Sequence, residues 1–255
     1  MEDGMLQLDQ VGVTGRLAPF SAHIDAGLQV HLIGPNGAGK STLLARLAGM
    51  LPGEGEIKLA GRALAAYPGE QLAQRRAYLS QQQPPVALMP VFQYLALHQP
   101  AGVDERPLES TIYYLCQRLK LTDKLSRMLT QLSGGEWQRV RLASVLLQVW
   151  PTINPHGRLL LLDEPTNSLD VAQKVALDRL LREFCQTGRC ALVCAHDLNH
   201  TLQQADRVWL LHAGQVVAQG ATRDVMQPDN LSKIYDVDFH LHAVGDQRWI
   251  MTRTA

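Results

Sequence analysis

The sequence predicts an α/β fold: a mixed, mainly parallel sheet with helices on both faces, antiparallel strands at the N-terminus and an inserted helical subdomain. Three observations predict it. Residues 159–162 are all leucine, as is typical of a parallel strand that is buried on both faces. Residues 30–33 form a short apolar run that leads through a glycine-rich turn into an amphipathic stretch, which indicates a strand–loop–helix unit. Residues 84–149 show mostly helical spacing after a proline-rich start.

The other elements follow in chain order. Residues 6–11 alternate apolar and polar side chains, which favours a half-exposed antiparallel strand, and a helix is predicted over about residues 41–48. Helices are also predicted near residues 108–119 and over 134–149, followed by a polar loop at 151–157. The remaining predicted strands are residues 77–80, 191–195, 208–211 and 215–218, the last two forming a hairpin around Ala213-Gly214.

Composition excludes several classes of protein. Lys+Arg and Asp+Glu are both 24 in 255 residues, and no basic run exceeds Arg75-Arg76, so we expect no nucleic-acid partner. The four cysteines contain no C-x-x-C pair and lie mostly in or beside apolar stretches, which favours buried thiols and a reducing cytoplasm. The first residues lack the pattern of a signal peptide, and no stretch approaches about 20 apolar residues. We therefore expect any membrane contact to go through a partner.

Residues 34–41 read GPNGAGKS and match the phosphate-binding pattern G-x-x-x-x-G-K-[ST]. Glycines let successive backbone N–H groups converge on phosphate oxygens, and the following helix presents its positive end. Lys40 can reach the β- and γ-phosphates of ATP, and the Ser41 hydroxyl can ligate Mg²⁺. The residues expected to hold the nucleotide are Gly34, Pro35, Asn36, Gly37, Ala38, Gly39, Lys40, Ser41 and Thr42.

Two adjacent carboxylates, Asp163 and Glu164, follow the apolar run 159–162. Open α/β sheets bind ligands at the carboxyl ends of their strands, so Asp163 is expected to hold Mg²⁺, directly or through water. Neighbouring strand residues point to opposite faces, so Glu164 is expected on the other side, where it can polarise the attacking water. The alternative is a strand that simply ends in solvated acids, and the nearby phosphate loop argues against it.

The helix predicted from residue 134 begins with LSGGE at residues 132–136. Ser133 and Glu136 have the spacing of a capping box. Gly134 and Gly135 weaken the first turn by about 1 kcal/mol each relative to alanine, which makes sense if this helix end closely approaches another group. An exposed helix N-terminus of this kind is a second anion site.

One nucleotide does not need two phosphate sites at opposite ends of a monomer, whereas two nucleotides shared by two monomers do. Each ATP would then lie between the phosphate loop of one copy and the Ser133 helix of the other. The sequence therefore predicts a head-to-tail homodimer.

These motifs, in this order, resemble the ATP-binding cassette (ABC) family over nearly the whole chain, and LSGGE is the most specific of them. The resemblance implies one nucleotide-binding domain over residues 1–255, with a P-loop NTPase core formed by 1–83 and 158–255 and a helical signature subdomain at 84–157. It also implies hydrolysis of MgATP, with Lys40 among the catalytic residues.

Three further roles come from the resemblance. Gln81 resembles the glutamine that senses Mg²⁺ and the attacking water and links the site to the membrane subunit, with Gln82 and Gln83 as alternatives. Asp170 belongs to a Ser-Leu-Asp segment that resembles the loop crossing the dimer interface. His196 resembles the histidine that bonds the γ-phosphate; the alternatives are a capping role before Asp197 or a metal pair with His200, which lacks a third ligand.

The chain departs from the family in two places. Residues 11–16 (VGVTGR) contain none of the aromatic residues that usually stack on adenine, so an aliphatic or arginine surface is expected there. The loop at 151–157 is longer than usual. The chain resembles the ATP-binding subunits of bacterial cobalamin importers in this loop combined with three other segments: QQQP at 81–84, LSGGEWQRV at 132–140 and AHDLNH at 195–200.

That resemblance implies a peripheral protein on the cytoplasmic face of the bacterial inner membrane, bound to two membrane permease subunits and served indirectly by a periplasmic substrate-binding protein. Residues 82–97 are the candidate docking surface for the permease, with ordinary subdomain core as an equal alternative. The other functions left open are import of iron-siderophore chelates or haem and a soluble, non-transport ABC ATPase. Single copies of each motif, without a long coiled-coil insertion, argue against the soluble class.

Overall fold

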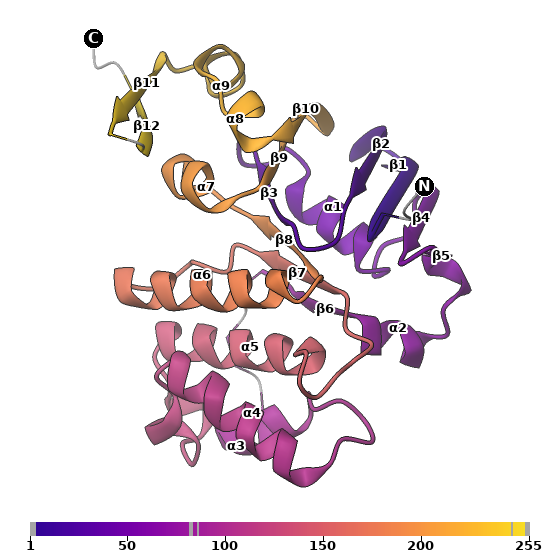
Figure 1. The fold of residues 1–255 in the computed structure, drawn as a ribbon, viewed down its shortest axis with the longest axis vertical. Helices are drawn as coiled ribbons and strands as arrows, with labels where there is room; N and C mark the ends of the chain where they lie inside the picture. Colours follow the sequence, from indigo (N-terminus) through magenta and orange to yellow (C-terminus); the bar gives the residue numbers. More distant parts are fainter. Residues whose placement is uncertain (1–3, 82–83, 86, 246, 253–255) are drawn as a thin grey trace.

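The protein is described here from a computed structural model, which covers residues 4–81, 84–85, 87–245 and 247–252. Its centre is a six-stranded sheet in the order β10-β9-β3-β8-β7-β6 (Figure 1). All neighbouring strands are parallel except β9 and β10, so the predicted mixed, mainly parallel sheet is confirmed. The strands are β3 (Gln29–Ile33), β6 (Arg76–Leu79), β7 (Leu159–Asp163), β8 (Cys190–Cys194), β9 (Arg207–His212) and β10 (Gln215–Ala221).

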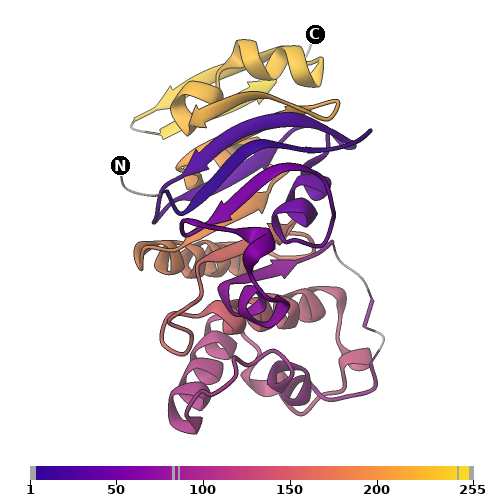
Figure 2. The same ribbon diagram turned by 90° about the vertical axis from the view of Figure 1, so that its right-hand side faces the viewer.

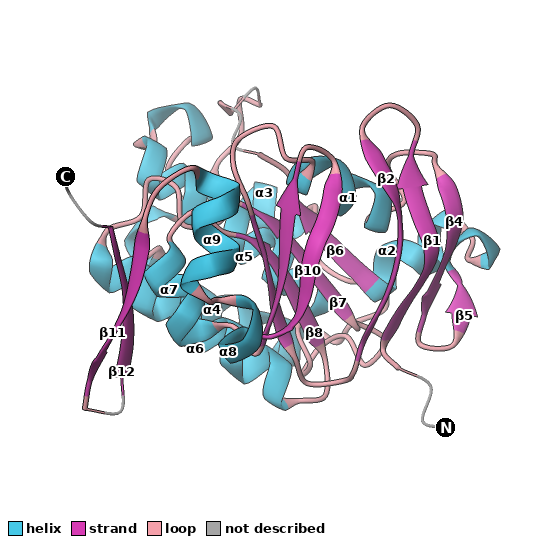
Figure 3. Ribbon diagram, turned by 90° about the horizontal axis from the view of Figure 1, so that it is seen from above, coloured by secondary structure: helices cyan, strands magenta, loops and turns pink. Residues whose placement is uncertain are grey.

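A second, antiparallel sheet in the order β2-β1-β4-β5 lies beside the first, as Figure 3 shows from above. Strand β1 (Leu6–Val13) confirms the antiparallel strand predicted at residues 6–11. The other strands of this sheet carry no sequence pattern strong enough to predict them. Near the C-terminus a separate hairpin forms. The strands are β1 (Leu6–Val13), β2 (Leu17–Ile24), β4 (Glu54–Leu59), β5 (Arg62–Ala63), β11 (Phe239–Val244) and β12 (Gln247–Thr252).

Helices cover both faces of the central sheet. Helix α1 (Lys40–Leu47) lies between the two sheets, while α5 (Gly134–Val149) and α6 (Val171–Gln186) pack on the opposite face. Helices α3 (Val91–Ala96) and α4 (Glu105–Arg118) pack on α5 at one end of the molecule (Figure 2). The other helices are α2 (Gly69–Arg75), α7 (Leu198–Gln204), α8 (Thr222–Val225) and α9 (Pro228–Tyr235), with 3₁₀ turns at Leu64–Ala66, Thr122–Lys124 and Leu129–Gln131.

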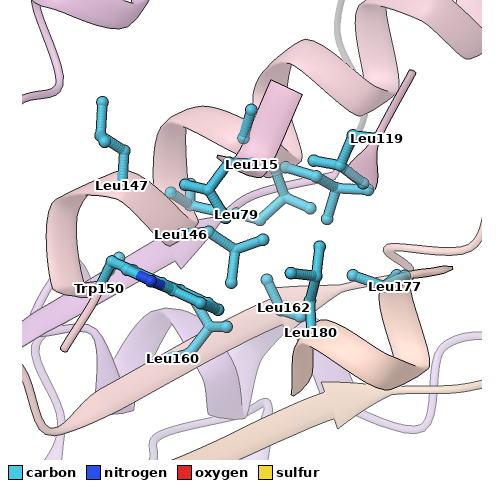
Figure 4. Packing of buried hydrophobic residues seen from close by; sticks show 14 of the residues in the cluster. Leu79, Leu115, Leu119, Leu146, Leu147, Trp150, Leu160, Leu162, Leu177 and Leu180 are labelled. Atoms are coloured by element: carbon cyan, nitrogen blue, oxygen red, sulfur yellow. The ribbon is translucent and has the colours of Figure 1, made fainter. Parts of the chain in front are cut away.

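The leucine run in β7 divides its side chains between two cores. Leu159 and Leu161 pack in the layer around α1, while Leu160 and Leu162 pack in the layer around α5 and α6. Figure 4 shows this second layer, a cluster that contains Leu160 and Leu162 together with leucines of α4, α5 and α6. Each fully buried leucine contributes about 1.5–3 kcal/mol. The two layers therefore fix both the carboxyl end of β7 and the helix that begins after Ser133.

The predicted polar loop at 151–157 is held at its centre by one buried amide. Asn154 donates to the carbonyls of Gln74 (2.7 Å) and Gln148 (2.6 Å) and accepts from the N–H groups of His156 and Gly157. The four cysteines are free and buried, as expected. Within the described residues, no helix combines the length and apolar character that a membrane span requires.

Candidate functional site

An open cleft of about 1090 Å³ lies along the carboxyl ends of the central strands. The phosphate loop forms its floor. Residues 14–19, in the β1–β2 turn and the start of β2, and residues 213–215, in the β9–β10 turn and the start of β10, also line it. Gln81, Glu164 and His196 line the same cleft. The structure thus brings together predicted residues that follow four strands, β3, β6, β7 and β8, which are far apart in the sequence.

The phosphate loop joins β3 to α1 and depends on two glycines. Gly34 has φ +145°, and a Cβ there would lie 2.0 Å from the backbone oxygen of Leu211. Gly39, at φ +102°, is the N-cap residue of α1. The Lys40 ammonium donates to the carbonyls of Gly34 (2.7 Å) and Pro35 (3.0 Å), so it lies inside the curve of the loop. Burial lowers the pKa of Lys40, and the nearby Cys194, Glu164 and Asp163 oppose that shift.

Asp163 is the last residue of β7 and is 2% exposed. Burial raises its pKa, while hydrogen bonds with Ser41 and Cys194 and the charge of Lys40 lower it. Its Oδ1 atom is buried and has no hydrogen-bond partner among the residues that the structure describes. An unpartnered buried carboxylate oxygen beside a serine hydroxyl fits a hard divalent cation such as Mg²⁺, which prefers oxygen ligands.

Glu164 lies beyond the end of β7, with φ +51°. Contrary to our expectation, the alternation of strand side chains therefore does not set the direction of the Glu164 side chain. A left-handed turn after the strand sets it instead. Oε1 contacts Nε2 of His196, and Oε2 accepts from Nδ2 of Asn167 at 2.6 Å. Burial raises the pKa of Glu164, but these two hydrogen bonds and the electrostatic attraction of His196 and Lys40 together lower the pKa below its ordinary value. Glu164 is therefore ionised at neutral pH.

His196 follows β8 and precedes the helix α7, whose N-cap is Asp197. The alternative of His196 as the cap is therefore wrong, because the Asp197 side chain accepts from the N–H of His200 at 3.0 Å. His200 bonds Asp178 on α6 instead. Among the described residues, no group of three or more His, Cys, Asp and Glu side chains is arranged to hold a metal ion.

Gln81 follows β6 at the edge of the central sheet, and its neighbours Gln82 and Gln83 lie outside the described residues, as does Val86. The carbonyl oxygens of Ser80 and Gln81 accept hydrogen bonds from Arg141 on α5, at 2.6 and 3.3 Å. The sequence did not predict the roles of Arg141 and Asn167. Arg141 contacts Ser80 and Gln81, which are distant in the sequence, and Asn167 contacts Glu164 across a turn. The only available signal was an arginine in the predicted apolar interior of a long helix.

The signature segment forms the predicted capping box. Ser133 Oγ accepts from the N–H of Glu136 at 3.3 Å, and the Ser133 N–H donates to Glu136 Oε2 at 2.8 Å. A Cβ on Gly135 would lie 2.7 Å from the backbone oxygen of Ser168, so part of the need for glycine arises within one chain. Asp170 caps α6 by accepting from the N–H of Gln173 at 2.8 Å.

These signature residues do not join the cleft of their own chain. The described residues that line the cleft do not include Ser133, Gly134, Gly135 or Asp170. One copy therefore presents a phosphate cradle with an acid and a histidine, and it presents the signature helix end elsewhere on its surface.

Comparison with known proteins agrees with this geometry. Residues 17–167 match the family model described as "ABC transporter". The chain is 65% identical to "Vitamin B12 import ATP-binding protein BtuD" of Yersinia enterocolitica, covering 98% of each chain. It is 62% identical to the protein of the same name from Pectobacterium atrosepticum, covering 98% of this chain and 100% of that one. A solved "ATP binding subunit of ABC transporter" superposes with a TM-score of 0.79 at 27% identity, covering 91% of this chain and 98% of that chain. The chain belongs to the ABC transporter family, as one of its ATP-binding ATPase subunits.

Proposed function

We propose that this chain is the ATP-hydrolysing subunit of a bacterial vitamin B12 importer. The observation that carries the reaction is the convergence of Lys40, Asp163, Glu164 and His196 around one phosphate cradle. The cargo assignment is supported by the name shared by relatives that are 62–65% identical over nearly the full chain.

In this proposal the backbone of residues 34–42 and the Lys40 ammonium bind the phosphates of ATP. Ser41, Asp163 and Gln81 would hold Mg²⁺, which when bound neutralises charge on the phosphate oxygens. Glu164, ionised at neutral pH, orients the attacking water and accepts its proton. His196 donates to the Glu164 carboxylate in this structure and is proposed to bond the γ-phosphate when nucleotide is present.

The cleft is proposed to be completed by a second copy in a head-to-tail dimer. Ser133, Gly134 and Gly135 of the partner copy would approach the γ-phosphate, since a helix N-terminus stabilises negative charge there. Asp170, at the start of α6, is proposed to lie at the same dimer interface. Closure on two ATP molecules and opening after hydrolysis would make the dimer a two-state element biased by ligand.

Two permease subunits are proposed to dock on the exposed part of the segment that follows Gln81. Leu88 is 81% exposed and Phe92 52% exposed, whereas Val91 is fully buried and Met89 packs against the core. The exposure of Leu88 and Phe92 supports docking for these two side chains, while Val91 and Met89 belong to the subdomain core. The complex would sit on the cytoplasmic face of the inner membrane and receive vitamin B12 from a periplasmic binding protein.

Crosslinking tests the docking surface. A cysteine at Leu88 should form an adduct with the permease in the intact complex, and a cysteine at the similarly exposed Tyr113 on α4 serves as the control. An adduct at Tyr113 but not at Leu88 would contradict the proposed surface.

Reconstitution tests the cargo. ATPase activity of the complex should rise when the periplasmic protein is loaded with vitamin B12. Stimulation by an iron-siderophore or haem instead would assign a different importer, and ATPase activity that never responds to a permease would favour the soluble class.

A further inference from the structure

Two buried polar side chains lie side by side on α5, the helix that begins after Ser133. Gln138 is 1% exposed and Arg141 is 7% exposed. Nη1 of Arg141 donates to Oε1 of Gln138 at 3.2 Å. A buried guanidinium is costly unless its donors are satisfied, so these contacts are expected to have a definite task. Burial lowers the pKa of Arg141, and the guanidinium stays protonated because its ordinary pKa is so high.

This pair binds backbone oxygens from two separate strand ends. Nη2 of Arg141 donates to the carbonyls of Ser80 (2.6 Å) and Gln81 (3.3 Å), which follow β6. Nε2 of Gln138 donates to the carbonyl of Pro165 (3.1 Å), which follows Glu164 and β7. One arginine and one glutamine therefore connect the segment that carries Gln81 with the turn that carries Glu164.

The sheet alone does not fix this spacing. Strands β6 and β7 are parallel neighbours up to Leu79 and Leu162, and β6 is the edge strand, so the segment beyond it has sheet support on one side only. Gln81 is exposed and lies in an irregular stretch. Its main chain is held from α5 by Arg141.

We propose that Arg141 and Gln138 are positioning residues, a strut that sets the distance of Gln81 from the Asp163–Glu164 end of β7 for ATP hydrolysis. This inference rests on the proposed roles of Gln81 and Glu164. Because α5 also carries Ser133 at its N-terminus, the strut transmits any rotation of that helix to Gln81. The position of Gln81 is then linked to the position of the signature segment through one rigid element.

Arg139 on the same helix provides a matched control. It is 8% exposed and donates to the carbonyls of Leu119 (3.1 Å) and Lys120 (3.3 Å), at the end of α4, and through Nε to the Gly135 carbonyl one turn earlier on α5 (3.3 Å). The two arginines are almost equally buried and each binds main-chain oxygens of another segment, but only Arg141 reaches the strand ends of the cleft. Loss of packing or of a buried charge should affect both variants alike.

The test compares Arg141→Met with Arg139→Met in the full-length chain. A displacement of about 1 Å at a catalytic group costs up to roughly 100-fold in rate, so we expect kcat of Arg141→Met to fall about 10- to 100-fold with KM for ATP within about threefold. Arg139→Met should lose similar thermal stability with kcat within about threefold. Equal loss of kcat in both variants, or wild-type kcat in Arg141→Met, would overturn the inference.

A second readout does not depend on turnover. The ratio of ATP dissociation constants without and with Mg²⁺ should shrink in Arg141→Met and remain at the wild-type value in Arg139→Met. If Arg141→Met does not fold, Arg141→Lys serves instead, because lysine can bond the Ser80 carbonyl but lacks the planar fork that also reaches Gln138. Wild-type kcat and an unchanged Mg²⁺ ratio in Arg141→Lys would overturn the strut.

A double-mutant cycle with Gln81→Ala distinguishes a failure of the proposed strut from a failure of the proposed ATP hydrolysis. If Arg141 acts through Gln81, Arg141→Met should cost less than about threefold in the Gln81→Ala background, because contacting groups are not additive. Fully additive losses, or a Gln81→Ala variant with wild-type kcat, would overturn the strut while ATP hydrolysis stands. A wild-type chain that hydrolyses no ATP would instead refute the proposed function.

Discussion

Replacing Glu164 with glutamine separates nucleotide binding from hydrolysis, because the change keeps the shape of the side chain. The carboxylate accepts from Asn167 at 2.6 Å through Oε2 and contacts Nε2 of His196 through Oε1. Glutamine has one acceptor oxygen and one NH₂ donor, so it can satisfy only one of these two donors. Loss of one hydrogen bond to a charged, partly exposed group costs about 1–2 kcal/mol of folding stability.

The catalytic loss is larger than that stability loss. A positioned general base contributes about 10²- to 10⁴-fold, which corresponds to roughly 3–5 kcal/mol of activation free energy. The variant should therefore fold, bind ATP with near wild-type affinity and hydrolyse it at least about 100-fold more slowly. Single-turnover hydrolysis and equilibrium ATP binding measure the two quantities, and Asn167→Ala, which removes one partner but keeps the acid, is the control.

The pH dependence gives this prediction a sign. The pKa of Glu164 is lower in the folded chain than its ordinary value of 4.5: burial raises it, but the bonds from His196 and Asn167 and the electrostatic attraction of His196 and Lys40 together lower it more. Its stabilisation is therefore present above pH 4.5 and is lost as pH falls through the folded pKa. The difference in unfolding free energy between wild type and Glu164→Gln should shrink over that acidic range. Near-wild-type turnover in Glu164→Gln, or a stability difference that grows on acidification, would refute the reasoning.

Three further perturbations test the surrounding structure. Gly34→Ala would place a Cβ 2.0 Å from the backbone oxygen of Leu211 and should abolish ATP binding. At Gly37 a Cβ meets nothing within 4 Å, so Gly37→Ala should lower folding stability by only about 1 kcal/mol, the strain of its left-handed backbone. Isothermal titration measures ATP binding and thermal melts measure stability in both variants. Arg16 lines the cleft, and no aromatic ring of Phe, Tyr or Trp occurs among the described lining residues; Arg16→Ala should raise KM for ATP about 3- to 10-fold, and the wild type should accept GTP within about tenfold of ATP in kcat/KM. Burial lowers the pKa of His31 to about 3, so the unfolded chain binds more protons than the folded chain between pH 6.5 and 3. As the pH falls through that window, the free energy of unfolding should fall by up to roughly 1.4 kcal/mol per pH unit. Urea denaturation at several pH values measures it, and a constant free energy of unfolding there would contradict the prediction.

Local patterns predicted the parts of the site that a single segment builds. The phosphate loop is a strand, a glycine turn and a helix in sequence, and β7 with its acid pair is an unbroken apolar run followed by Asp163. The capping box at Ser133 was also predictable, since both partners lie within one helical turn. Strands β2 and β4 were missed because their burial alternates weakly and their pairing partner, β1, must be known first.

Contacts between distant segments could not be predicted. The bonds of Arg141 to Ser80 and Gln81 span about 60 residues of sequence, and nothing near Arg141 announces them. The direction of Glu164 depends on a left-handed turn, which sequence patterns rarely reveal for a residue other than glycine. The need for glycine at 135 likewise arises partly from the Ser168 backbone, which the chain brings beside α5 only when folded.

The most direct test of the central claim, that each ATP site is completed by a second copy, is the steady-state ATPase rate of Ser133→Asp compared with Ser133→Asn. Both residues keep the N-cap of α5 that Ser133 provides, so both variants should melt near the wild-type temperature and bind ATP in their own phosphate loops. Only aspartate would set a negative charge against the γ-phosphate held by the partner, which costs roughly 4 kcal/mol at close range near a protein surface. A site shared by two copies predicts a loss of about 10³-fold in Ser133→Asp, much less in Ser133→Asn, and a wild-type specific activity that falls on dilution to monomers. Full-rate hydrolysis by Ser133→Asp, or by wild-type monomers, would contradict a shared site.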